Sequence, residues 1–209
     1  MMRLLELFAG SRSVGKVAGA MGWQVFSVDV HPFDDIDLVK DIAQITRQDI
    51  PFVPDVIWAS PVCTTYSIAA ISHHRNGTEP KSDEAKVADR LLLKTLEIIG
   101  LFPSAKFFIE NPRGMMRKMP ILQNYDRATV WYCQYGDTRA KPTDIWSNHI
   151  GSVFVSGWQP RPMCFNGNTD CHHQPAPRGS RTGTQGLKGS YERSKIPKAL
   201  IEEILRSCL

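Results

Sequence analysis

Short, almost continuously apolar segments alternate along the chain with helical ones, and this alternation restricts the fold more than any other feature. The apolar segments are residues 2–9, 24–30, 54–60, 105–112, 128–136 and 143–150. Strands that are apolar on both faces are typical of a parallel sheet covered by helices on each side. The pattern therefore predicts an α/β fold with a mostly parallel, doubly wound sheet.

The strongest helical pattern covers residues 82–101, between the third and fourth apolar segments. Ser82 is suited to cap this helix, and Asp83 and Glu84 stand in its first turn, where acidic groups interact favourably with the helix dipole. Apolar side chains recur along one face at helical spacing. This helix fits the strand–helix–strand order that a parallel sheet requires.

The character of the chain changes at about residue 151. From there it is rich in Gly, Pro and polar residues without a clear period, whereas "IPKALIEEIL" near the end has an apolar stripe and a proline suited to a first helical turn. We therefore expect a core over 1–150, a short irregular segment over 151–190, and a C-terminal helix in 191–209 that returns to the core.

Composition excludes several classes of protein. Hydrophobic residues make up 42% of the chain and charged residues 22%, which is too apolar for global disorder, and no apolar segment has the length of a membrane span. Five cysteines are an odd number and too few for a disulfide scaffold, and the start lacks the apolar core of a signal peptide. We expect a cytoplasmic protein with reduced thiols and no membrane partner.

A net charge of +4 does not by itself predict a nucleic-acid partner. Basic residues do gather between 175 and 198, where Arg178 and Arg181 belong to a stretch rich in Gly, Ser and Pro. Such a stretch is able to follow a phosphate backbone, and the alternative is a solvated, flexible loop.

Residues that follow the apolar segments are candidate site residues, because ligands of parallel sheets bind beyond the carboxyl ends of the strands. The first segment runs into a turn at Gly10 that is not G-x-G-x-x-G, and the second ends at Asp29. Together they suggest an adenosine-type cofactor without a pyrophosphate, or else a plain tight turn and a surface carboxylate. Asp41 and Ile42 offer a carboxylate for an exocyclic amine and an apolar surface for a flat ring, although a solvated aspartate is the other interpretation.

Two later strand ends carry reactive groups. "SPVCTTYS" places Cys63 two residues after Pro61. A thiolate on a shaped turn is a nucleophile, whereas a free cysteine is more often a small buried hydrophobe. "ENP" places Glu110 beside Asn111 at the end of an apolar strand, where a carboxyl group suits a general acid or, alternatively, belongs to a turn cluster.

The remaining candidates are two cationic residues and a group of cysteines and histidines, which are common metal ligands. Arg139 and Lys141 alternate along a predicted strand and so share a face, which suits either an anion or a charge-guarded edge. A C-x6-C-H-H run suggests a zinc site, although its spacing is unusual and adjacent histidines are poorly placed to reach one ion. Its members are Cys164, Cys171, His172 and His173.

In their order along the chain, these motifs resemble those of the DNA (cytosine-5) methyltransferases, which use S-adenosylmethionine. "LELFAGSRSVG" resembles their opening motif, "SPVCTTYS" their loop G-P-P-C-Q-x-F-S, "ENP" their E-N-V segment, "DTRAKPT" their Q-x-R-x-R strand, and "SKIPKALIEEIL" their last helical motif. The resemblance covers 1–150 and about 186–209. It implies a Rossmann-like methyltransferase fold and an enzyme that acts on double-stranded DNA.

The resemblance also implies roles for individual residues. Cys63 would attack carbon 6 of a flipped-out cytosine and Glu110 would grip the base, while Arg139 and Lys141 would hold the base and the loop. Residues 68–81 would form a mobile loop that closes over the base. The implied cofactor residues are Phe8, Ala9, Gly10, Ser11, Asp29, Asp41, Ile42 and Pro61. The other implied substrate residues are Thr64, Ser67, Asn111, Arg178 and Arg181.

The chain departs from the family pattern at several points. The usual glutamine of the loop is Thr64, the valine of E-N-V is Pro112, and the second arginine of the basic pair is Lys141, which lacks bidentate geometry. The family carries its target-recognition domain where this chain has only residues 151–190, which implies a short or relaxed recognition sequence. In its small size the chain resembles compact phage-carried enzymes, which act in the cytoplasm of the bacterium or of the infected cell. The same residues also fit RNA methylation, or an inactive relative that binds DNA or cofactor.

Overall fold

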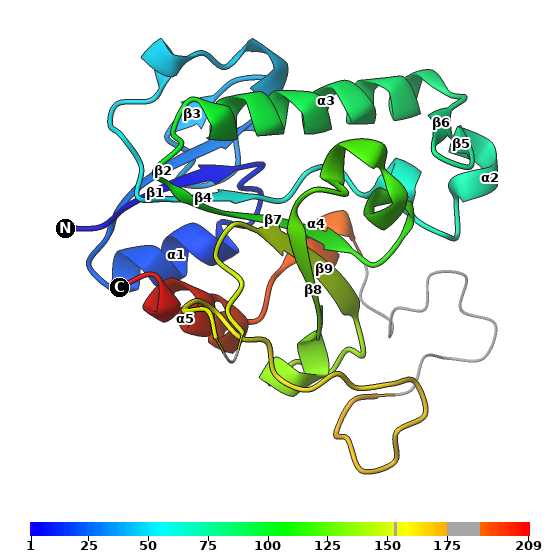
Figure 1. Cartoon of the computed structure of the whole chain (residues 1–209). Coiled ribbons are helices and arrows are strands. Elements are labelled where there is room, and N and C mark those ends of the chain that lie inside the picture. The colour runs from blue at the N-terminus through cyan, green and yellow to red at the C-terminus, as the bar shows by residue number, and fades with distance from the viewer. Residues whose placement is uncertain (153, 175–188) are drawn as a thin grey trace.

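A seven-stranded sheet with helices on both faces forms the centre of the chain (Figure 1). The computed structural model describes residues 1–152, 154–174 and 189–209. The strands of the sheet are β1 (Arg3–Leu7), β2 (Gln24–Asp29), β3 (Leu38–Val39), β4 (Val56–Ala59), β7 (Lys106–Pro112), β8 (Asp126–Trp131) and β9 (Pro142–Ser147). They lie in the order β3-β2-β1-β4-β7-β9-β8, and β9 alone runs opposite to the other six. The predicted mostly parallel, doubly wound sheet is confirmed.

The helices form the outer layers. They are α1 (Ser13–Ala20), α2 (Ile71–His74), α3 (Asp83–Gly100), α4 (Ser190–Ser194) and α5 (Lys198–Ser207). Figure 1 shows α3 on one side of the sheet, and α1 and α5 together on the other. Because successive side chains of a strand point to opposite faces, Leu5 packs in the core under α3, while Leu4 packs with α1 and α5.

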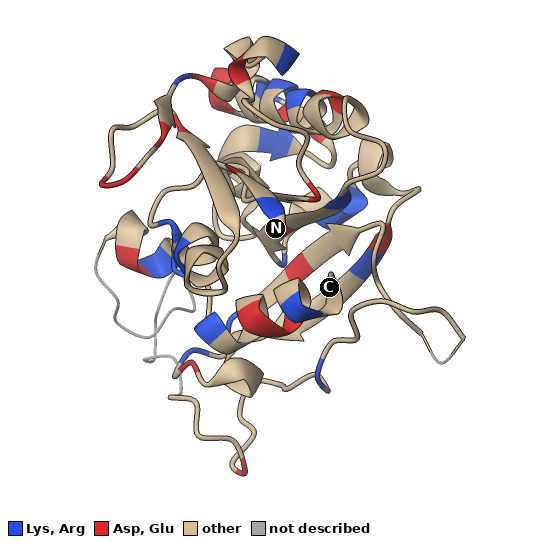
Figure 2. Cartoon of the chain, turned by 90° about the vertical axis from the view of Figure 1, so that its left-hand side faces the viewer, with Lys and Arg blue, Asp and Glu red and all other residues tan. Residues whose placement is uncertain are grey.

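The predicted helix cap at Ser82 is confirmed, because its hydroxyl oxygen accepts a hydrogen bond from the amide of Ala85 at 3.2 Å. In the described ranges, no helix has both the length and the apolar character needed to cross a bilayer. On the face turned toward the viewer in Figure 2, basic and acidic segments stand side by side on the helices, in keeping with the small net charge.

Within the described residues, six short 3-10 helices connect these elements. They are η1 (Ile42–Gln44), η2 (Arg47–Asp49), η3 (Thr64–Tyr66), η4 (Met115–Lys118), η5 (Pro120–Leu122) and η6 (Tyr132–Tyr135). The strand predicted over 128–136 ends at Trp131 instead, and the chain turns through η6 to Gly136, whose φ of 85° favours glycine. Tyr132 and Cys133 are buried in this turn, at the carboxyl end of β8.

The C-terminal helix packs against the core. The ammonium group of Lys106 donates to the carbonyl oxygen of Cys208 at 2.7 Å, and α5 packs against α1. A small hairpin of β5 (Arg75–Asn76) and β6 (Glu79–Pro80) follows α2. Within residues 148–152, 154–174 and 189, the structure has neither helix nor strand beyond isolated bridges, which agrees with an irregular insertion.

Candidate active site

Cys63 lies directly beyond the carboxyl end of β4, at the start of η3. β4 pairs in parallel with β7, so the loop of Pro61 and Cys63 and the pair Glu110–Asn111 belong to the same edge of the sheet. The side-chain amide of Asn111 donates a hydrogen bond to the carbonyl oxygen of Pro61 at 2.9 Å. Asn111 is 1% exposed, and among the described residues its Oδ1 atom has no hydrogen-bond partner. The Cys63 loop is therefore attached to the Glu110 strand by a buried polar bond.

A buried arginine supports the other side of this loop. Arg75 is 3% exposed, donates to the carbonyl oxygen of Thr65 at 3.0 Å, and forms an ion pair with Asp89 at 2.6 Å. The Tyr66 hydroxyl donates to the same carboxylate at 2.7 Å. The segment 68–81, predicted as a mobile loop that closes over the base, contains α2 and the β5–β6 hairpin, and the charge of Arg75 within it is compensated inside the protein by Asp89.

Glu110 faces a tyrosine that the sequence analysis did not single out. The phenol of Tyr132 donates to Oε1 of Glu110 at 2.9 Å, and both residues are buried. Burial, followed by the carboxylate of Glu110, raises the pKa of Tyr132 well above its usual value, so its hydroxyl remains a donor. The sequence does not reveal this pair, because its apolar pattern predicts a strand that continues through Tyr132 to residue 136.

The two predicted cations lie over the ring of Tyr132 and share one partner, the carbonyl oxygen of Arg193. The Lys141 ammonium lies 4.7 Å from the ring centroid and donates to the carbonyl oxygen of Arg193 at 3.3 Å. Arg139 is paired with the Asp137 carboxylate, and it also donates to the carbonyl oxygens of Arg193 and Lys195 at 3.1 and 2.9 Å. Arg139 therefore fastens the segment before α5 to the core.

The electrostatic surroundings of Cys63 disfavour its thiolate in the free protein. The residue is exposed, yet partial desolvation of the sulfur and then the Glu110 carboxylate raise the pKa of the thiol above its ordinary value of 9.0. The Lys141 ammonium acts in the opposite direction. Glu110 and Lys141 therefore both lie within electrostatic range of Cys63. Thr64 and Ser67 lie exposed beside Cys63.

The turn after β1 meets the end of β2 at the predicted cofactor residues. Asp29 accepts hydrogen bonds at 2.9 Å from the amide of Gly10 and from that of His31, one on each carboxylate oxygen. Phe8 and Gly10 have φ values of 56° and 48°, so the turn is sharply shaped. A Cβ at Gly10 would meet nothing closer than 3.9 Å, which leaves this side of the turn open.

The donor set at these strand ends fits an adenosine group. Asp29 retains one free lone pair on each oxygen for ribose hydroxyls, and Asp41 is exposed, with one oxygen accepting from the amide of Ala43. Ile42 is buried in the core under α3. Ala9 and Ser11, on either side of Gly10, are buried, and so is Pro61, two residues beyond the end of β4. Asp29 and Asp41 are thus compatible with the adenosine half of S-adenosylmethionine, whereas Ile42, at 3% exposed, offers little surface to a flat ring.

Glu6 is a buried acid that sequence analysis missed. It is 2% exposed, and its carboxylate accepts hydrogen bonds from the amides of Val14 and Gly15 at the start of α1, at 3.2 and 3.1 Å. Burial outweighs these bonds and raises the pKa of Glu6 to about 7. An acidic residue inside an apolar strand was the signal that could have identified it, because such a group requires partners.

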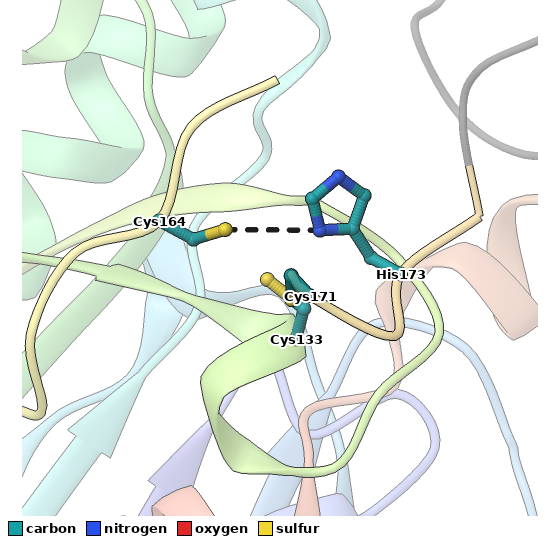
Figure 3. Close-up of side chains that lie close together, drawn as sticks. All are labelled: Cys133, Cys164, Cys171 and His173. Atoms are coloured by element: carbon teal, nitrogen blue, oxygen red, sulfur yellow. Dashed lines mark hydrogen bonds between the residues drawn. The ribbon is translucent and has the colours of Figure 1, made fainter. Parts of the chain in front are cut away.

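The predicted zinc ligands are only partly brought together. Cys164, Cys171 and His173 converge, and the fourth member of the group is Cys133 from η6 (Figure 3). His172 is excluded, because its Nε2 atom lies 3.2 Å from the carbonyl oxygen of Asp137. Adjacent side chains point in different directions, which is why His172 and His173 do not share a centre. Arg178 and Arg181 lie outside the described residues.

Comparisons with known proteins concern the sequence and the fold of the chain. No family model matches the chain. A protein of Frog virus 3 (isolate Goorha), named "Probable DNA (cytosine-5)-methyltransferase", is 30% identical over 226 aligned residues, which cover 99% of this chain and 100% of the viral protein.

Two solved structures share the fold. A candidate DNA modification methyltransferase encoded within an E. coli prophage has a TM-score of 0.53 and 14% identity, with 79% of this chain and 53% of that one covered. The Entamoeba histolytica methyltransferase EhMeth has a TM-score of 0.51 and 13% identity, with 70% and 52% covered. The chain thus spans about half the length of these two structures, and at such identities the likeness concerns the fold alone.

Proposed function

The chain belongs to the DNA (cytosine-5)-methyltransferase family, and from this premise we propose that it methylates carbon 5 of a cytosine flipped out of double-stranded DNA, with S-adenosylmethionine as methyl donor. The observation that carries the proposal is the convergence of Cys63 and Glu110 at neighbouring strand ends, joined through the Asn111–Pro61 hydrogen bond. A sulfur nucleophile and a carboxyl group at one edge are the two groups that addition to a cytosine ring requires.

Carbon 5 of cytosine becomes a nucleophile only after a group has added to the ring. The Cys63 thiolate forms a bond to carbon 6, while protonated Glu110 donates a hydrogen bond to ring nitrogen N3, where negative charge develops. S-adenosylmethionine, when bound, supplies an electrophilic methyl group for carbon 5. Loss of the proton from carbon 5 then expels the Cys63 thiolate and restores the double bond.

Lys141 and Arg139 have different roles in this proposal. The Lys141 ammonium lowers the pKa of the Cys63 thiol and so opposes the effects of desolvation and of Glu110. This supports Lys141 as the group that stabilises the thiolate. Arg139 is a positioning residue, because most of its N–H groups already bind Asp137 and the carbonyl oxygens of 193 and 195.

Tyr132 is a further positioning residue. Its hydroxyl hydrogen is donated to Oε1 of Glu110, so the proton of a neutral Glu110 resides on Oε2, which is then the atom that donates to the base. The Tyr132 ring is fixed by burial and by the cations above it. The pair therefore sets both the rotation of the Glu110 carboxyl group and the position of its proton.

The cofactor and DNA contacts follow from the same edge of the sheet. Asp29 accepts hydrogen bonds from ribose hydroxyls, Asp41 accepts one from the adenine amine, and the turn around Gly10 adjoins the methionine half. Thr64 and Ser67 donate to DNA phosphates beside Cys63. Arg178 and Arg181 add phosphate contacts from the segment 151–190, which serves as a minimal recognition region between the core (1–150) and the closing helix (191–209).

A trapping experiment tests the proposed activity. The chain is incubated with S-adenosylmethionine and double-stranded DNA that contains 5-fluorocytosine, in which the fluorine cannot leave carbon 5 as a proton does. We expect a covalent protein–DNA adduct on a denaturing gel, absent for Cys63→Ala. Cys208→Ala is the matched control, because Cys208 is a buried cysteine of the α1–α5 core, and it retains the adduct.

Two other results would contradict the proposal. An adduct that forms only with 5-fluorocytosine RNA identifies an RNA methyltransferase. Binding of S-adenosylmethionine and DNA without any adduct identifies an inactive relative. Bisulfite sequencing of DNA from expressing cells then gives the sequence context of the methylated cytosines.

A further inference from the structure

Three thiols and one imidazole meet beside the site, in a group made of Cys133, Cys164, Cys171 and His173, hereafter the Cys3His cluster. Their four potential ligand atoms all lie within 4.8 Å of one another (Figure 3). Cys133 comes from η6 in the core, whereas the other three come from the irregular insertion, about 30 to 40 residues later in the chain. The cluster therefore joins two parts of the chain that are far apart in sequence.

The separation of Cys164 and His173 is close to that of two ligands in a tetrahedral zinc site. Bond lengths of about 2.3 Å to sulfur and about 2.0 Å to nitrogen, at a tetrahedral angle, place the two atoms about 3.5 Å apart. The distance between Sγ of Cys164 and Nδ1 of His173 is 3.7 Å. All five cysteines of the chain are free, so none of these sulfurs is engaged in a disulfide bond.

Side-chain amides surround the sulfurs in the manner expected for metal-bound thiolates. The amide of Asn168 donates to Sγ of Cys164 at 3.5 Å, and that of Gln134 donates to Sγ of Cys171 at 3.9 Å. N–H donors offset the negative charge that three thiolates bring to one divalent ion. Three of the four residues are buried and Cys171 is half-buried, which leaves little access for water.

In the described part of the chain, the insertion contacts the core through the buried Trp158 and the Arg161–Glu203 ion pair, but the apolar cluster around the thiols is small. That apolar cluster contains only Trp131, Cys133, Ala140 and Cys164, with Cys171 packed at its edge. Two of its four buried members are thus candidate ligands themselves. A metal ion bonded to four side chains would supply the stabilisation that such a small apolar contact does not.

We propose that the Cys3His cluster binds one structural Zn²⁺ ion, which fixes the insertion to the core. A set of four protein ligands fills a tetrahedral site and leaves no position for substrate, so the ion is structural rather than catalytic. Soft thiolate and imidazole ligands select zinc over magnesium or calcium. The cluster contains none of the residues that the methylation proposal assigns to the base or the cofactor. The two proposals are therefore tested independently.

The Cys3His cluster also connects the insertion with the segment beside the proposed active site. Beyond His173, the amide of Gln174 donates to the carbonyl oxygen of Thr138 at 2.9 Å. Thr138 lies between Asp137 and Arg139, which form the ion pair beside Tyr132. Zinc bound at the cluster therefore holds the insertion on the segment that positions Arg139.

Metal analysis of the purified full chain tests the site directly. We expect about one zinc ion per chain, and replacement by Co²⁺ should give the thiolate-to-metal charge-transfer absorption of a tetrahedral sulfur site. Cys133→Ser should lose the metal, whereas His172→Asn and Cys208→Ser should retain it. His172→Asn is the sharpest control, because sequence alone favours His172 as a ligand and the structure favours Cys133.

Thiol counting on the unmodified chain keeps the test decisive if Cys133→Ser fails to fold. In the zinc-loaded protein, the exposed Cys63 should react with a thiol reagent, and a chelator should release three more reactive thiols. Hydrogen exchange in 159–174 should increase after chelation while that of β1 and β4 stays unchanged. Absence of bound metal in the parent, a disulfide within the cluster, or loss of zinc in His172→Asn would each overturn the assignment.

Discussion

The side-chain amide of Asn111 and the carbonyl oxygen of Pro61 lie 2.9 Å apart, and this hydrogen bond joins the ends of two neighbouring strands. One strand leads into Cys63 and the other carries Glu110. A single buried amide thus ties the loop of Cys63 to the strand of Glu110. The relationship depends on the parallel pairing of β4 and β7, which brings both strand ends to the same edge.

Asn111→Ala should impair catalysis more than stability. Loss of the donor leaves the Pro61 oxygen unpaired in a buried position, which costs about 1–3 kcal/mol of unfolding free energy. Displacement of the Cys63 loop should lower the single-turnover methylation rate by tenfold or more, since attack needs close alignment. Asn148→Ala is the control: it removes two hydrogen bonds, to Phe107 and Ala105, from the other end of β7. Equal rate losses in both variants would contradict the role of Asn111.

Tyr132→Phe should slow adduct formation while leaving affinity unchanged. The variant removes the hydroxyl that donates to Glu110 and keeps the aromatic ring under Lys141. We expect a decrease of about tenfold in the single-turnover rate, which corresponds to the free energy of one buried hydrogen bond. The dissociation constants for DNA and S-adenosylmethionine should be unchanged. The same substitution at Tyr135, whose hydroxyl bonds the amide of Arg161 instead, should have no effect on the rate. A rate loss confined to Tyr135→Phe would refute the assignment.

Alkylation of Cys63 should be slow at neutral pH and should keep increasing above pH 9. Desolvation and the Glu110 carboxylate raise the pKa of the thiol above its ordinary value of 9.0, and only the thiolate reacts. Lys141→Gln removes a cation that lowers this pKa, so its alkylation profile should move to higher pH. Lys86→Gln, on the exposed face of α3, should not shift the profile. Iodoacetamide labelling read by peptide mass spectrometry measures the rates, and a parent midpoint below pH 9 would contradict the account.

The unfolding free energy should contain a contribution from Glu6 that decreases as pH rises. The pKa of Glu6 is about 7 in the folded protein, against an ordinary value of 4.5. Between these values the folded state retains a proton that the unfolded state has released, so the stability present below pH 4.5 is lost as pH rises through 7. The full shift corresponds to about 3 kcal/mol.

Urea unfolding at pH 5 and pH 8 measures this contribution when the parent is compared with Glu6→Gln. The variant cannot titrate, so its stability should change less between the two pH values than that of the parent. Asp55→Asn is the control, because Asp55 is an exposed carboxylate that accepts a hydrogen bond from the amide of Arg3 on the same strand. An unchanged pH dependence in Glu6→Gln would show that its burial does not control the titration.

Much of the fold was predictable, because its determinants are local. Apolar strands, the Ser82 cap and the helical stripe near the end depend on residues within a few positions of one another, and the structure confirms them. The order of the motifs also predicted that Cys63 and Glu110 belong to one site, since the carboxyl ends of parallel strands meet at one edge.

The sequence by itself determined the alternation of strands and helices and the identity of the reactive groups. Only the tertiary structure decided which distant side chains meet: Tyr132 with Glu110, Arg75 with Asp89, and Cys133 in place of His172 in the Cys3His cluster. Hydrophobic periodicity specifies which face of an element is buried, but it does not specify which polar groups are buried together. That pairing is decided when η6 and the insertion pack, because each buried donor, acceptor or charge then requires a partner within reach.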